Sequence, residues 1–250
     1  MIRPYLVYCP PYTVLSAGIV VMHRLANELH ARGLPVFINE QEQNPKWDRL
    51  PVITRMEGEA IAVYPEIVSE NPFGCGRIVR YLLNKPGFWK SVQYYDTDIL
   101  FVYSDFWNEE IELHLPKERV LNLNAINEAE WQDYGWVRNI DLWYQGKGSG
   151  PFDQHPVSAV NLPRECPEGW DQNTWMKQML GRCKTFYCYD NATALADIAS
   201  LCGCKVVYFP DPRMTKKPRD LDNIRQWYKD NEIEFQKKLD GFIRITQEAP

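Results

Sequence analysis

Residues 5–39 contain the stretch that decides the fold, YLVYCPPYTVLSAGIVVMHRLANELHARGLPVFIN. Its opening run YLVY predicts a short buried strand, which the pair Pro10-Pro11 ends. Ser16 is typical of a helix N-cap, and Gly33 is typical of the residue that stops a helix. A second apolar run follows at 34–39. The order strand, helix, strand predicts a parallel sheet.

The same alternation of patterns continues to the end of the chain. In the first half, further strands are expected at 60–67, 99–103 and 119–122, and a short helix at 77–84. In the second half, strands are expected at 141–145, 185–189 and 205–209, and helices at 173–183, 192–202 and about 221–247. We therefore expect an α/β protein with two Rossmann-like parallel-sheet halves, closed by a long C-terminal helix.

A polar, tryptophan-containing stretch at about 124–137 is the expected linker between the halves. The predicted domains are an N-terminal Rossmann-like domain at 1–125 and a C-terminal Rossmann-like domain at 138–220. The apolar stripe of the last segment predicts that 221–250 form a helix that packs back on the N-terminal half.

Composition bounds the class of protein. The chain has 250 residues with a net charge of −5, which argues against broad, non-specific binding of nucleic acid. Its seven cysteines show no disulfide-like spacing, which predicts a reducing compartment. The sequence shows no signal peptide, and no apolar run approaches the ~20 residues that a membrane span needs. A cytoplasmic location is therefore expected. The 13% aromatic content suits stacking on sugars or bases, or a bulky core.

Ligands of open parallel sheets bind outside the carboxyl ends of the strands. The first candidate there is Gly146-Lys147-Gly148, the start of a glycine-rich loop that runs to Gly150. Glycines let the backbone approach a ligand closely, and the lysine supplies a point charge suited to a diphosphate. The spacing is not that of a P-loop. A surface turn with a solvated lysine is the alternative.

The second candidate runs from Tyr189-Asp190 to Thr193 and joins a strand to a helix. The free N–H groups of a helix start suit an anion or a sugar hydroxyl. A capping role for Asp190 is the alternative. A basic loop follows the last strand of this half and either faces solvent or contacts phosphate; it contains Arg213, Lys216, Lys217 and Arg219.

Two further candidates lie in the first half. Ser16 and Gly18 begin the first helix directly after the first strand, where an ordinary cap and a packing glycine are the alternative reading. Glu66 ends a buried strand, and a carboxylate there can act as a general base or bind sugar hydroxyls. A strand-terminal glutamate in solvent is the competing interpretation.

Taken together, these residues resemble the GT-B glycosyltransferases, in particular the retaining enzymes that use nucleotide-sugar donors. The most specific match runs from Phe186-Tyr187-x-Tyr189-Asp190 through Thr193 to Cys202-Gly203-Cys204, and the resemblance covers most of the chain. Tyr144 to Gly148 is similar to the strand that opens the donor half, and Ser16-Ala17-Gly18 to the small-residue loop that faces the donor diphosphate. The family often has two glutamates eight positions apart, where this chain has Asp190 and Ile198.

The resemblance implies a glycosyltransferase with a cleft between an acceptor-side and a donor-side half, acting with retention and without a metal or other cofactor. Lys147 would stabilise the leaving diphosphate, an electrostatic task. The implied catalytic residues are Asp190 and Glu66. The implied donor-binding residues are Ser16, Gly18, Gly146, Lys147, Gly148, Tyr189, Asp190 and Thr193.

The implied partners are a nucleotide-sugar donor and an acceptor that is a glycan, a small molecule or modified DNA. Two alternatives stay open. One is a non-catalytic nucleotide or carbohydrate binder of the same fold, and the other is a phage-type glycosyltransferase that acts on modified DNA bases.

Overall fold

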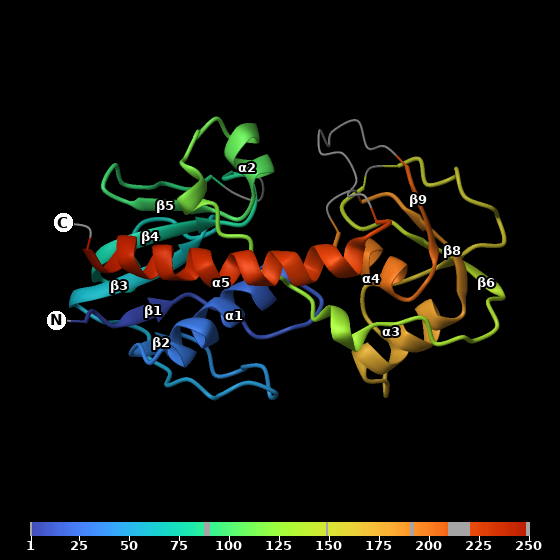
Figure 1. Ribbon diagram of the computed structural model, residues 1–250, viewed down its shortest axis with the longest axis horizontal. Coiled ribbons are helices and arrows are strands. Elements are labelled where there is room, and N and C mark those ends of the chain that lie inside the picture. Colours follow the sequence, from blue (N-terminus) through green and yellow to red (C-terminus); the bar gives the residue numbers. More distant parts are fainter. Residues whose placement is uncertain (1, 88–90, 149, 191–192, 210–220, 249–250) are drawn as a thin grey trace. The chain divides into compact units, whose positions relative to one another are not determined.

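The computed structural model describes residues 2–87, 91–148, 150–190, 193–209 and 221–248 (Figure 1). The chain divides into two compact units. The first unit comprises residues 1–125 and 231–250, and the second unit comprises residues 126–230. Each unit is built on one parallel sheet, so the expected α/β architecture with two parallel sheets is confirmed.

The sheet of the first unit has five parallel strands in the order β2-β1-β3-β4-β5. The strands are β1 (Tyr5–Val7), β2 (Val36–Ile38), β3 (Gly58–Pro65), β4 (Cys75–Leu82) and β5 (Ile99–Val102). The helices are α1 (Ala17–Ala31), α2 (Asp105–Glu110), the 3-10 turn η1 (Lys117–Arg119) and, for its C-terminal part, α5 (Ile224–Glu248). The predicted strand–helix–strand opening is confirmed as β1-α1-β2.

The predicted helix at 77–84 is wrong, because this segment forms β4. β4 lies between β3 and β5, and Val79 pairs with Val63 on one side and Ile99 on the other. A strand that is covered on both faces is apolar throughout, so periodicity does not separate it from a short buried helix. The predicted strand at 119–122 is reduced to one bridge, from Val120 to Val102, after the turn η1.

Two helices cover one face of this sheet. α1 packs there through Val21, Leu25 and Leu29, and α5 through a stripe that is fully buried: Phe235, Leu239 and Phe242. The hydroxyl groups of Tyr5 on β1 and Thr246 on α5 form a hydrogen bond of 2.6 Å. The hydrophobic core of the first unit therefore depends on a helix that is more than 100 residues away in the chain.

The opposite face of the sheet contains a buried ion pair. Arg80 on β4 is 0% exposed, and its Nε donates to the Asp98 carboxylate at 2.7 Å. The guanidinium also donates to the carbonyl oxygens of Val68 and Glu70. The central carbon of the guanidinium, Cζ, lies about 5 Å from the ring centres of two tyrosines, Tyr64 and Tyr94. The guanidinium is thus buried with each of its three nitrogens hydrogen-bonded.

The sheet of the second unit has four parallel strands in the order β7-β6-β8-β9. The strands are β6 (Ile140–Tyr144), β7 (Val160–Asn161), β8 (Cys183–Cys188) and β9 (Lys205–Tyr208). The helices are α3 (Gln172–Gly181), α4 (Leu195–Leu201) and the 3-10 turn η2 (Glu128–Glu130). β7 and α2 are two elements that the sequence patterns did not predict.

The core of the second unit lies on one face of its sheet. Leu142 and Phe186 pack there against α3 and α4, together with Ile224 and Tyr228 from the start of α5. The predicted long C-terminal helix is therefore confirmed, and it packs against both sheets. Within the described part of the chain, no helix is both long and apolar enough to span a membrane.

Candidate functional site

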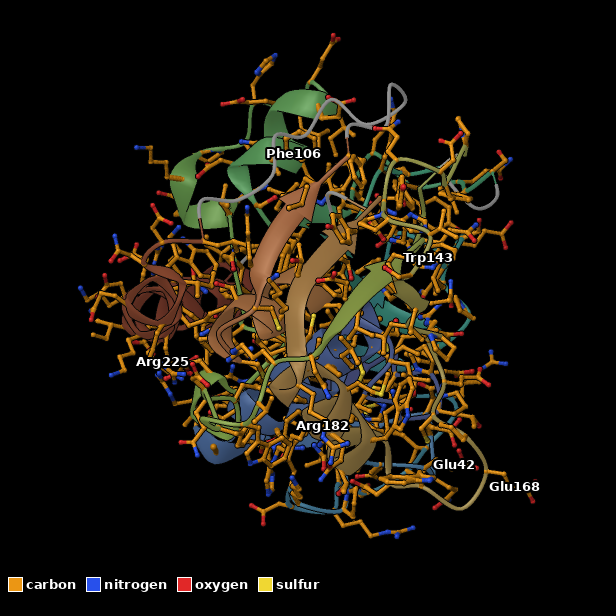
Figure 2. The ribbon with its side chains drawn as sticks, turned by 90° about the vertical axis from the view of Figure 1, so that its right-hand side faces the viewer. Glu42, Phe106, Trp143, Glu168, Arg182 and Arg225 are labelled. Atoms are coloured by element: carbon orange, nitrogen blue, oxygen red, sulfur yellow. The ribbon has the colours of Figure 1, made fainter. Side chains whose placement is uncertain are left out.

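The carboxyl ends of β6 and β8 bring two predicted motifs together in the second unit. The two strands are neighbours, and the N–H of Tyr189 donates to the Tyr144 carbonyl at 3.0 Å. The glycine loop, residues Gly146 to Gly148, therefore lies beside Tyr189 and Asp190. Figure 2 labels Trp143 near this end of β6. Ser149 lies outside the described residues.

The two glycines are required by contacts within the protein. Gly146 has a φ of +56°, and a Cβ atom there would lie 2.4 Å from the Asp190 side chain. A Cβ atom on Gly148 would lie 2.2 Å from the Tyr189 carbonyl oxygen. Both distances are shorter than real Cβ contacts, so the glycine loop packs directly on the end of β8.

Asp190 anchors this loop through its carboxylate. The side chain is buried, and one carboxylate oxygen accepts the backbone N–H of Lys147 at 2.9 Å. The N–H of Gly148 donates to the Gln145 carbonyl at 3.0 Å. Two N–H groups of the loop are thus used to shape it, while the Lys147 residue itself is exposed. The group that the loop presents to solvent is the lysine.

The start of α4 differs from the prediction. The helix begins at Leu195 with Ala194 as its N-cap, so Asp190 does not cap it. Thr193 instead accepts the N–H of Leu195 through its hydroxyl oxygen at 3.2 Å. Residues 191–192, where the sequence predicted the helix start, lie outside the described residues, as does the basic loop from Arg213 to Arg219.

Ile198, which stands where GT-B enzymes often have a second glutamate, and its neighbour Asp197 both make contacts within the protein. Ile198 packs against the core of the second unit. Asp197 is buried, and its carboxylate accepts the hydroxyl of Tyr228 on α5 at 2.6 Å. Neither side chain is therefore placed to bind a ribose in the way a glutamate would.

An aromatic wall lies beside the glycine loop and consists of Trp143, His155, Tyr187, Tyr189 and Phe209. Its central residue, His155, was not predicted from the sequence. The imidazole stacks on Trp143 with ring centres 4.6 Å apart. Its Nδ1 lies 2.8 Å from the Tyr189 hydroxyl, which also accepts the N–H of Gln154 at 3.1 Å. Burial raises the pKa of Tyr189, so its hydroxyl stays protonated at neutral pH. Phe209 packs on the Tyr189 ring at 4.7 Å.

The sequence pattern along β6 and β8 predicts part of the aromatic wall. Trp143 and Tyr187 are register partners and alternate with the core residues Leu142 and Phe186. Alternation places these two aromatic side chains on the sheet face away from the core. The loop that brings His155 against them has no such periodicity.

The candidate residues of the first unit gather at the carboxyl edge of the other sheet. Glu66 is buried, which contradicts the interpretation of a glutamate in solvent. Its carboxylate accepts the N–H of Leu83 at 3.0 Å, directly after β4. A Cβ atom on Gly18 would meet the Leu83 side chain at 3.5 Å, an ordinary contact. Ser16 is the N-cap of α1, as predicted, without a side-chain capping bond.

The packing of the glycine loop leads to a stability prediction. Gly148→Ala is expected to lower the free energy of unfolding of the second unit by about 1–3 kcal/mol, because the Tyr189 carbonyl is backbone and cannot rotate away. Hydrogen exchange of the β6 and β8 amides measures the effect. Gly241→Ala on α5, where no atom lies within 4 Å of the added Cβ, is the control. Equal protection in both variants would contradict the contact.

Comparison with models of known protein families gave no match, and a search of curated proteins gave none either. Among the described residues, no three side chains of His, Cys, Asp or Glu gather as a possible metal site.

Proposed function

We propose that this protein is a glycosyltransferase that takes a nucleotide-diphosphate sugar as its donor, with the donor bound at the glycine loop of the second unit. The observation that carries the proposal is the convergence of the exposed Lys147 and the buried Asp190 at the carboxyl edge of a parallel sheet. This edge is where α/β sheets bind their ligands. The sequence resemblance to GT-B enzymes supplies the reaction class.

In this proposal Lys147 neutralises the diphosphate. Its ammonium group is a compact point charge, and charge that is in place before the reaction stabilises the leaving group without reorganisation. Asp190 acts as a positioning residue, because its carboxylate fixes the backbone from which the lysine extends. Glu66 in the first unit keeps its predicted role as a general base or a ligand of sugar hydroxyls. Retention of stereochemistry rests on the resemblance.

Two observations favour a second function, a non-catalytic binder of nucleotides or nucleotide sugars. The Asp190 carboxylate already accepts a backbone N–H, and Ile198 packs in the core. Binding of a donor with neither hydrolysis nor transfer in the presence of candidate glycan acceptors would favour this second function.

Donor binding is tested by following the melting temperature of the wild type and Lys147→Ala with UDP, GDP and their glucose and mannose conjugates. A ligand of the folded state at a hundredfold excess over its Kd stabilises by about 2.7 kcal/mol. We expect one nucleotide to stabilise the wild type and Lys147→Ala to lose the shift. Lys184→Ala, an exposed lysine on β8 near its amino end, is the matched control and should keep it.

Two variants of Asp190 test whether its carboxylate positions the loop that binds the nucleotide. Asp190→Asn retains an oxygen that accepts the Lys147 N–H, so it should bind the nucleotide, whereas Asp190→Ala should not. If no nucleotide shifts the wild type, the proposed donor site is wrong.

A further inference from the structure

Two adjoining cavities lie at the amino edge of the second sheet, the edge opposite the glycine loop. Their volumes are about 590 and 530 Å³, within the range of about 300–1,000 Å³ that is typical of ligand pockets. They share three polar residues: Asn139, Gln178 and Arg182. Figure 2 labels Arg182 at the opposite end of the sheet from Trp143. We call the two cavities together the amino-edge groove.

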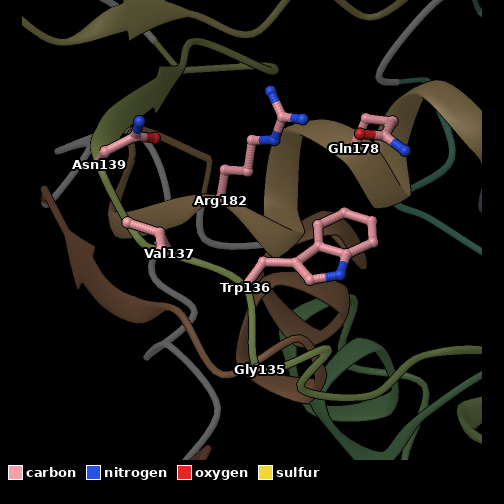
Figure 3. A pocket seen from close by; sticks show the side chains of 6 residues that line it. All are labelled: Gly135, Trp136, Val137, Asn139, Gln178 and Arg182. Carbon is pink, nitrogen blue, oxygen red and sulfur yellow. The ribbon is translucent and has the colours of Figure 1, made fainter.

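A backbone hydrogen bond joins the two segments that supply the polar residues of the groove. Asn139 precedes β6, Gln178 lies on α3 and Arg182 follows it, and the N–H of Asn139 donates to the Arg182 carbonyl at 3.1 Å. The polar side chains thus come from two segments that a backbone hydrogen bond holds together (Figure 3).

Tryptophan side chains flank the polar residues. The ring of Trp136 lies against the backbone of Gly181, where a Cβ atom would be 2.6 Å from it, and Tyr134 stacks on it at 4.9 Å. This packing holds the indole in place while 38% of the residue stays exposed. In the second cavity Trp170 is 50% exposed, beside Pro167. The groove therefore presents two partly exposed indoles, Trp136 in the first cavity and Trp170 in the second.

The polar side chains of the groove are available to a ligand. Within the described part of the chain, no hydrogen bond or ion pair engages the side chains of Asn139, Gln178 or Arg182. Arg182 is the one charged residue among the described residues that line either cavity. The described lining of the two cavities contains no carboxylate, and its two amides and one guanidinium suit hydroxyl groups and a single anionic group.

We infer that the amino-edge groove binds an oligosaccharide that carries a carboxylate, such as a uronic or sialic acid residue. The indoles offer flat apolar surfaces to the C–H faces of sugar rings, and the amides of Asn139 and Gln178 match hydroxyl groups. Arg182 matches the carboxylate with two parallel hydrogen bonds. A nucleic acid is a poorer match, because its backbone demands several cations along the groove. The inference does not depend on the donor site proposed above.

The test is binding to an array of neutral oligosaccharides and of oligosaccharides with uronic or sialic acid residues, followed by calorimetry with the best acidic glycan. We expect acidic glycans to bind the wild type. Trp170→Ala and Arg182→Gln should each weaken binding at least tenfold. Controls in the first unit, Trp47→Ala for the indole and Lys117→Gln for the charge, should bind as the wild type does.

Two results would overturn the inference: no acidic glycan binds the wild type, or binding survives both groove variants. Arg182→Gln changes an exposed side chain and keeps the test valid if Trp170→Ala does not fold. Lys147→Ala should leave glycan binding unchanged, so that failure of the donor site and failure of the groove give different results.

Discussion

Arg80→Met should lower the free energy of unfolding of the first unit by about 3–5 kcal/mol, the usual cost of removing one partner of a buried ion pair. The variant leaves the Asp98 carboxylate without its cation in a site where both side chains are 0% exposed. One Asp98 oxygen, Oδ1, is already buried without a hydrogen-bond partner among the described residues. The Arg80→Met variant also leaves the carbonyl oxygens of Val68 and Glu70 without their donor.

Urea unfolding measures the loss, and hydrogen exchange assigns it to a unit. Amides of β3 and β4 should lose protection, while those of β6 and β8 serve as an internal reference. Arg55→Gln removes one partner of an ion pair with Glu57 whose side chains are about 70% exposed, so its effect should stay below about 1 kcal/mol. The double variant Arg80→Met/Asp98→Leu should recover much of the lost stability. An Arg80→Met effect as small as that of Arg55→Gln would contradict a buried pair.

Phe242→Ala should lower the free energy of unfolding by a similar amount, about 3–5 kcal/mol. The Phe242 ring is fully buried, with its centre 4.7 Å from that of Phe101 and 6.3 Å from that of Tyr5. These contacts join α5 to two strands of the first sheet, so truncation leaves a cavity between helix and sheet.

The control for Phe242→Ala lies on the same helix. Ile233 is 58% exposed, and Ile233→Ala should change the unfolding free energy by no more than about 0.5 kcal/mol. Circular dichroism in urea compares the two variants. If both have the same small effect, the C-terminal part of α5 does not belong to the core of the first unit.

Much of the fold follows from local patterns. The strand–helix–strand opening, the strands β6, β8 and β9 and the long final helix are all visible in the spacing of apolar residues. The convergence of Lys147 and Asp190 is also predictable, because neighbouring parallel strands end at the same edge of a sheet.

Other features could not be predicted from the sequence, because they depend on partners that are distant along the chain. The segment Cys75–Leu82 is a strand because β3 and β5 lie on either side of it, and its own sequence equally suits a buried helix. The roles of Gly146 and Gly148 depend on the end of β8, about 40 residues away, and His155 stacks on Trp143 from a loop without periodicity.

The amino acid sequence by itself determined the class of fold, two parallel α/β sheets with a final helix, because hydrophobic periodicity is a property of each segment alone. Only the tertiary structure decided which side chains carry structural roles. It showed that Asp190 holds a loop, that Arg80 is paired with Asp98, and that Arg182 shares its cavities with the partly exposed Trp136 and Trp170. Those roles arise from contacts between residues far apart in the chain, which no local pattern records.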